Sequence, residues 1–127
     1  MDKNYIEGTV AAGLGEGAFF MSMKYYKNEI KAKLGFIAYP GTLNLKVGNR
    51  QKGSLQNLNK IKIDGFKKEN KTFGAADCYV ARIGKVNGAI IVPHLTKHKD
   101  IIEFIAPVHL RTSLNLKDGD KVKVELV

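Results

Sequence analysis

The sequence predicts a mainly β protein, a small β-barrel with two or three short helices. Apolar and polar residues alternate at a period of two in many short segments, whereas only two segments carry helix signals. The chain has 127 residues, 44% of them apolar and 26% charged, which is enough for a self-sufficient core and excludes a disordered chain. Many short strands with few helices favour a barrel over a parallel α/β sheet. We expect one domain over residues 1–127.

Seven segments are expected to form strands, because each shows the alternation or is bounded by turn residues. They are Ile6–Val10, Leu43–Val47, Ile61–Ile63, Thr72–Ile83, Val86–Val92, Ile101–Ala106 and Lys121–Val127. Gly84 and Lys85 are expected to turn the fourth strand into the fifth as a hairpin. Asp118 and Gly119 predict a turn before the last strand.

Two segments carry helix signals. Ser22 is a favourable N-cap for a helix that Gly35 would end. The apolar residues of that helix recur at i, i+3, i+7 and i+11, at Met23, Tyr26, Ile30 and Leu34. Pro107 suits the first turn of a second, short helix that extends to about Leu114.

The charge balance predicts an anionic partner. Twenty-one basic and twelve acidic side chains give a formal net charge of +9. Seven of the basic and two of the acidic residues lie between Arg50 and Thr72. Such an excess suits nucleic acid, a nucleotide or a membrane surface alike, and the lysine-rich run in this stretch is also typical of a solvated face.

The cysteine content and the hydropathy exclude several classes. Cys78 is the only cysteine, so an internal disulfide and a cysteine–histidine zinc site are excluded, and we expect Cys78 in the core. No stretch approaches the roughly 20 apolar residues that span a bilayer, and the N-terminus lacks the layout of a signal peptide. We therefore expect a cytoplasmic protein without membrane association.

A glycine-rich stretch follows the first predicted strand. Gly13, Gly15 and Gly17 alternate with other residues and allow backbone N–H groups to approach an anion without obstruction by side chains. This arrangement suits a phosphate cradle, but the spacing is neither that of a P-loop nor that of a dinucleotide-binding loop. A simple glycine-rich turn is the alternative.

Thr42 and Asn44 are candidate metal ligands. They lie two positions apart at the start of a strand, so both side chains point to one face, opposite Leu43 and Leu45. A hydroxyl and an amide oxygen are hard ligands of the kind that Mg²⁺ accepts. The alternative is a turn in which both side chains cap neighbouring backbone groups.

The segment 94–111 holds further polar candidates. Thr96 and Glu103 flank the start of a strand, and both can hydrogen-bond a polar ligand. Glu103 alternates with Ile101 and Ile105, which is unusual for a carboxylate if that face belongs to the core; a solvated barrel face is the alternative. The histidines lack a tight metal-binding pattern and are expected to be solvated: His94, His98 and His109.

Together these segments resemble the CTP-dependent riboflavin kinases of archaeal type. The resemblance covers nearly the whole chain and rests on the order and spacing of several motifs. These are GLGEG at 13–17 followed by Phe19 and Phe20, PGTLNL at 40–45, GAIIVP at 88–93, IIEFIAP at 101–107, HLR at 109–111 and LNLKDGD at 114–120. It implies a cradle-loop type of β-barrel and phosphorylation of riboflavin to FMN with CTP as phosphoryl donor and Mg²⁺ as cofactor.

The resemblance also implies roles for individual residues. Thr42 and Asn44 would hold Mg²⁺, and Thr96 and Glu103 would contact the flavin, with Glu103 as base or orienter of the attacking hydroxyl. The nucleotide would be bound by two segments: Gly13, Leu14, Gly15, Glu16, Gly17 and Ala18, and Val108, His109, Leu110 and Arg111. Ala18 departs from the basic residue expected there, so the loop must rely on backbone amides and other cations.

Two other functions fit the sequence. A basic β-barrel of the swapped-hairpin transcription-factor type would bind nucleic acid, which the net charge favours. A flavin-storage barrel would bind flavin without catalysis. The kinase is favoured because a nucleic-acid binder has no need for Thr42 and Asn44 on one face, and because the basic run holds one aromatic residue, Phe66, and no interleaved series for stacking. We expect a monomer that binds riboflavin and CTP.

Overall fold

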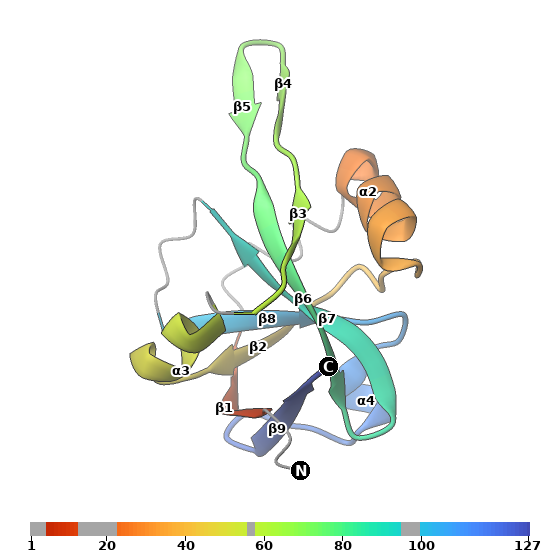
Figure 1. Ribbon diagram of the computed structural model, residues 1–127. Coiled ribbons are helices and arrows are strands. Elements are labelled where there is room, and N and C mark those ends of the chain that lie inside the picture. Colours follow the sequence, from red (N-terminus) through yellow and green to blue (C-terminus); the bar gives the residue numbers. More distant parts are fainter. Residues whose placement is uncertain (1–4, 13–22, 56–57, 95–99) are drawn as a thin grey trace.

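Six antiparallel strands close into a barrel in the computed structural model, which describes residues 5–12, 23–55, 58–94 and 100–127 (Figure 1). The order around the barrel is β6–β7–β8–β2–β1–β9, and β9 pairs again with β6 to close it. The strands are β1 (Tyr5–Ala11), β2 (Leu43–Lys46), β6 (Ala76–Ile83), β7 (Val86–Pro93), β8 (Ile101–Ile105) and β9 (Lys121–Leu126). The mainly β fold class and the barrel are therefore confirmed.

The edge of β6 is shared by two other strands. β3 (Ile61–Ile63) pairs with its first half, where Ile61 lies opposite Cys78. β9 pairs with its second half, where Leu126 lies opposite Ala81. The predicted turns that connect the strands are confirmed, since Gly84 and Gly119 both have positive φ.

Two hydrophobic clusters stabilise the fold, one on each side of the barrel wall. The barrel core fills the interior with the inward-facing residues of the strands, among them Leu45, Ile90, Phe104 and Val124. The outer core lies between the wall and α2 (Lys24–Leu34); it includes Tyr26, Ile30, Cys78, Ile91 and Ile105. Alternation at a period of two explains the division, because successive side chains of one strand point to opposite faces.

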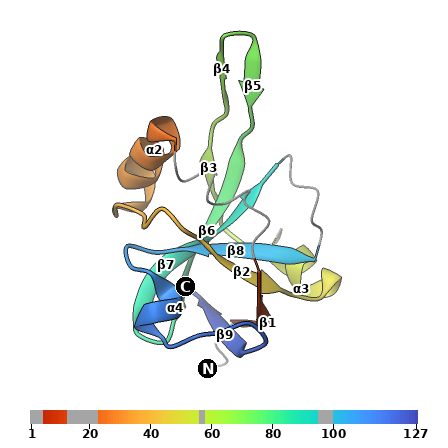
Figure 2. The same ribbon diagram turned by 180° about the vertical axis from the view of Figure 1, so that it is seen from behind.

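The helix α2 lies against the outer face beside β3 and β6 (Figures 1 and 2). Tyr26 and Ile30 are fully buried, and the Tyr26 hydroxyl donates to the carbonyl of Gly74 at 2.6 Å. The predicted C-terminal end at Gly35 is confirmed. The predicted N-cap is wrong by one residue: Met23, not Ser22, occupies that position, because its carbonyl accepts the first helical hydrogen bond from Lys27.

A hairpin outside the barrel corrects the prediction of one strand over Thr72–Ile83. β4 (Phe66–Lys68) and β5 (Lys71–Phe73) form a separate two-stranded sheet that projects away from the barrel (Figure 1). Gly74 and Ala75 separate β5 from β6, because the chain changes partners from β4 to β3 and β7 at this point. Phe66 and Phe73 stack at 4.7 Å between ring centroids, and Phe66 contacts Tyr25 of α2 at 4.3 Å.

Two short helices complete the structure. α3 (Asn49–Ser54) was not expected as an element of its own, since it buries no residue and has no apolar periodicity. α4 (Leu110–Ser113) begins later than predicted, and Pro107 is not in its first turn. The first helical hydrogen bond of α4 runs from Ser113 to the carbonyl of His109, while the preceding Ala106 carbonyl accepts from Tyr39 instead. In the described parts of the chain, every helix is too short and too polar to cross a membrane.

Candidate functional site

Three residues singled out in the sequence meet on the outer face of the barrel. Asn44 on β2 lies directly opposite Glu103 on β8 in the strand register. The Thr42 hydroxyl donates to Oε1 of Glu103 at 2.9 Å. Residues 61 positions apart in the chain are thus brought into one polar group by the pairing of two strands.

The alternation of β2 places this group on the outer face. Leu43 and Leu45 are 2% and 0% exposed and belong to the barrel core, so Thr42 and Asn44 face the other way, as predicted. The alternative in which Thr42 caps neighbouring backbone is wrong, because its hydroxyl donates to a side chain of another strand.

Glu103 is buried, with 5% of its surface exposed. The alternative of a solvated barrel face is therefore wrong. A buried carboxylate needs hydrogen-bond donors, and the Thr42 hydroxyl supplies one. A carboxylate kept on a face that continues into the outer core at Ile105 is a candidate for chemistry rather than for packing.

A small hollow of about 80 Å³ lies beside this group and joins the PGTLNL and HLR motifs. Its lining residues come from the approach to β2 and from the start of α4: Tyr39, Gly41, Thr42, Leu43, His109, Leu110 and Arg111. The rings of Tyr39 and His109 lie 5.0 Å apart at 35°. Tyr39, which is 40% exposed, was not identified in the sequence; an exposed aromatic residue directly before the PGT motif is the signal that could have found it.

Arg111 ties this hollow to the end of β1. Its Nη2 atom lies 2.6 Å from Oδ1 of Asp118 and donates to the carbonyl of Ala11 at 3.2 Å. Ala11 is two residues before Gly13, the start of the glycine-rich stretch. The predicted nucleotide-binding residues Gly13, Leu14, Gly15, Glu16, Gly17 and Ala18 lie outside the described residues.

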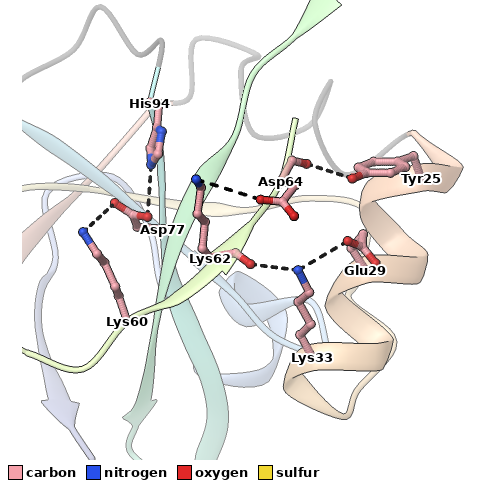
Figure 3. Close-up of polar contacts among 8 residues, drawn as sticks. All are labelled: Tyr25, Glu29, Lys33, Lys60, Lys62, Asp64, Asp77 and His94. Atoms are coloured by element: carbon pink, nitrogen blue, oxygen red, sulfur yellow. Dashed lines mark hydrogen bonds and ion pairs between the residues drawn. The ribbon is translucent and has the colours of Figure 1, made fainter. Parts of the chain in front are cut away.

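The segment with the second predicted flavin contact is described only at its two ends. Thr96 lies outside the described residues, as does His98. Before it, Nε2 of His94 lies 3.0 Å from Oδ1 of Asp77, whose other oxygen is 3.7 Å from Nζ of Lys60 (Figure 3). After it, the carbonyl of Asp100 accepts from the backbone of Val47 at 2.8 Å.

A second polar group in Figure 3 fixes α2 to β3 and does not belong to the site. The Tyr25 hydroxyl donates to the carbonyl of Asp64 at 2.9 Å, and Nζ of Lys33 donates to the carbonyl of Lys62 at 3.0 Å. These contacts are exposed and hold the helix against the strand. Their role is structural.

The donor set at Thr42 and Asn44 fits a hard cation. The Thr42 hydroxyl donates a hydrogen bond to Glu103, which leaves the lone pairs of its oxygen available, and the Asn44 side chain offers an amide oxygen on the same face. In the described part of the chain, no three histidine, cysteine or acidic residues gather as metal ligands. Cys78 is inert, because burial and then the charge of Asp77 raise the pKa of its thiol to about 12.

Comparison with known proteins gives consistent matches. Residues 10–126 match the family model CTP-dep_RFKase, described as "Domain of unknown function DUF120". A riboflavin kinase of Pyrobaculum calidifontis is 46% identical over 123 residues, which covers 94% of this chain and 58% of that protein. A riboflavin kinase of Methanosarcina mazei is 40% identical over 129 residues, with 98% and 57% covered.

A third relative has a similar identity and coverage. The riboflavin kinase of Archaeoglobus fulgidus is 41% identical over 126 residues, with 96% of this chain and 54% of that protein covered. The chain therefore spans a little more than half the length of these relatives.

Proposed function

Because the chain belongs to the family of CTP-dependent riboflavin kinase domains, we propose that it transfers the γ-phosphoryl group of CTP to riboflavin and so produces FMN. The observation that carries this proposal is the group formed by Thr42, Asn44 and Glu103 on the outer face of the barrel. It combines two neutral oxygen ligands with a buried carboxylate beside a hollow. Phosphoryl transfer needs this combination of positioning and charge stabilisation, and no covalent enzyme intermediate.

We assign the nucleotide to the hollow next to α4 and to the glycine-rich stretch. The rings of Tyr39 and His109 offer aromatic surfaces for a pyrimidine base. Backbone groups of Val108, Leu110 and Arg111 are proposed to contact its polar edge; the carbonyls of Leu110 and Arg111 already accept from Leu114 and Leu116, so their N–H groups would serve. The backbone N–H groups of Gly13–Ala18 are proposed to bind the phosphates, since no cationic side chain stands at position 18.

Thr42 and Asn44 are proposed to hold Mg²⁺ through their side-chain oxygens. When bound there, the cation supplies charge neutralisation for the phosphate oxygens. Neutral ligands suit this role because they leave most of the positive charge available to the phosphates. The bond from Thr42 to Glu103 orients the hydroxyl so that its lone pairs face away from the carboxylate.

Glu103 is proposed to act on the riboflavin hydroxyl. The ribityl 5′-oxygen forms a bond to the γ-phosphorus of CTP, the bond from that phosphorus to the bridging oxygen breaks, and CDP leaves. The hydroxyl proton is accepted or oriented by the Glu103 carboxylate, and Thr96 is proposed as a second flavin contact. Burial keeps competing water away from the carboxylate.

The proposal is tested by incubating the chain with riboflavin, Mg²⁺ and each of the four ribonucleoside triphosphates, followed by chromatography. We expect FMN with CTP and little or none with ATP, GTP or UTP. Flavin binding without FMN from any of the four donors would support the storage function instead. Absence of flavin binding together with salt-sensitive DNA binding would support the transcription-factor function. The cytoplasmic location, the monomeric state and the single domain stay predictions.

A further inference from the structure

A second hollow of about 310 Å³ lies on the barrel beyond the candidate site, between β1, β2, β9 and the start of α3. Its lining is rich in cations. The polar side chains around it are those of Glu7, Thr9, Lys46, Arg50, Gln51 and Lys121. None of these residues belongs to the proposed flavin, metal or nucleotide contacts.

The strand register sets the spacing of the central three residues. Thr9 on β1 lies opposite Lys46 on β2 and, on its other side, opposite Lys121 on β9. Neighbouring strands lie about 4.8 Å apart, so the two lysine backbones are roughly 10 Å apart with the Thr9 hydroxyl between them. Both lysines are exposed, and their flexible stems can bring the ammonium groups together over Thr9.

The cations of this hollow have no acidic partner in the described part of the chain. Some other surface cations do, such as Lys33 with Glu29 and Arg82 with Glu125. The hairpin lysines Lys67, Lys68 and Lys71 likewise make no ion pair with a described residue, but they do not line this hollow. Within the hollow, Lys46, Arg50 and Lys121 make no ion pair with any described residue.

The acid of the same hollow is directed to another cation. Oε1 of Glu7 lies 3.9 Å from Nζ of Lys123, the residue opposite it on β9. Three cations and one hydroxyl therefore share this hollow with one carboxylate, which lies near a fourth cation, and the excess of positive charge favours an anion there.

We propose that this hollow is a second anion site, which binds a diphosphate group on Thr9, Lys46, Arg50 and Lys121. Two ammonium groups and the two arms of a guanidinium group match the oxygens of two linked phosphates. The Thr9 hydroxyl can donate a further hydrogen bond to one of these oxygens. The site is separate from the proposed metal site: Lys46 lies two residues along β2 from Asn44, roughly 7 Å away. It does not depend on the proposed kinase activity.

A small anion fits the arrangement better than nucleic acid does. The cations come from three elements and converge on one hollow, whereas a phosphate backbone is followed by a longer stripe. The exposed lysines of the hairpin, Lys67, Lys68 and Lys71, belong to a different part of the molecule and do not line this hollow. They provide a matched control.

The test is a titration with inorganic pyrophosphate in the absence of divalent cations, followed by calorimetry and by the backbone amide signals of Thr9, Lys46 and Lys121. We expect saturable binding and shifts centred on these amides. The double variant Lys46→Gln/Lys121→Gln should weaken binding by roughly tenfold or more, because two charge-assisted contacts are lost. The control Lys68→Gln/Lys71→Gln, with the same change of charge, should bind within about twofold of the parent.

Further variants and ligands separate this site from the proposed nucleotide site. Thr42→Val should leave pyrophosphate binding unchanged, whatever it does to FMN formation. If CDP shifts the same three amides, a nucleoside diphosphate is a natural source of the diphosphate group. If only pyrophosphate shifts them, the ligand is a free anion. Both results support the site. Equal losses in the two lysine variants, loss in Thr42→Val, or binding of duplex DNA without binding of pyrophosphate would overturn it.

Discussion

One row of side chains crosses four neighbouring strands on the outer face of the barrel, and its two halves differ in character. Cys78 on β6 lies opposite Ile91 on β7, Ile91 lies opposite Glu103 on β8, and Glu103 lies opposite Asn44 on β2. The first half belongs to the outer core, where Cys78 and Ile91 are 0% and 2% exposed. The second half carries a carboxylate and an amide.

The difference follows from what covers each half. The helix α2 contributes Tyr26 and Ile30 to the same cluster as Cys78 and Ile91, so this half is selected for apolar packing. Asn44 and Glu103 instead lie beside the Thr42 hydroxyl and a hollow. One face of one sheet thus serves stability at β6 and β7 and supports chemistry at β8 and β2.

The largest effect is expected in the covered half. Ile30→Ala removes a fully buried side chain from α2 and should lower the free energy of unfolding by about 2–5 kcal/mol, because a cavity remains against the wall. Denaturant unfolding measures it. Ile37→Ala, at a residue 63% exposed, is the control and should change stability little. A loss of stability for Ile30→Ala as small as that for Ile37→Ala would show that α2 does not cover a core.

Substitutions in the polar half should separate activity from stability. Thr42→Val or Asn44→Leu should lower FMN formation by about 100-fold or more, since a ligand oxygen of the proposed metal site is lost. The unfolding midpoint should remain within a few degrees of the parent. Thr72→Val on the exposed hairpin is the control and should retain full activity. Undiminished turnover in both Thr42→Val and Asn44→Leu would remove the metal assignment.

The two halves also differ in how far they could be predicted. Alternation is local, so the strand around Leu43 and Leu45 and the outward position of Asn44 followed from the sequence. The bond between Thr42 and Glu103 did not, because residues 61 positions apart meet only when β2 and β8 pair. The sequence indicated that Glu103 is unusual for a core face. The strand register shows that it lies opposite Asn44 and next to the Thr42 hydroxyl.

The remaining errors have physical causes of the same kind. The segment Asn49–Ser54 and the segment Phe66–Lys71 lack apolar periodicity, so α3 and the β4–β5 hairpin were not predicted, whereas β3 between them was predicted from the alternation of Ile61 and Ile63. The start of α4 was misplaced because a proline tolerates a first helical turn but does not require one. The contact that decides it comes from Tyr39, whose backbone N–H donates to the Ala106 carbonyl.

The pH dependence of stability tests the burial of the covered half. Burial raises the pKa of Cys78 from 9.0 to about 12, so the folded state keeps the thiol neutral where the unfolded chain ionises. The contribution of the neutral thiol to the free energy of unfolding is fully present below pH 9. It is lost as the pH rises towards 12, by up to about 1.4 kcal/mol per pH unit. Unfolding of Cys78→Ala and of the parent between pH 8 and 11 measures the difference. An equal change of unfolding free energy with pH in the two proteins would contradict the burial of this thiol.

The smallest effect is expected at the hydrogen bond that Tyr26 makes in the outer core. Tyr26→Phe removes the hydroxyl that donates to the Gly74 carbonyl at 2.6 Å but keeps the buried ring. Because the carbonyl then loses a partner, stability should fall by about 1 kcal/mol, less than for Ile30→Ala. Tyr5→Phe, at a residue 53% exposed, is the matched control. A loss as large as that of Ile30→Ala would mean that this hydrogen bond, rather than apolar packing, holds α2 against the barrel.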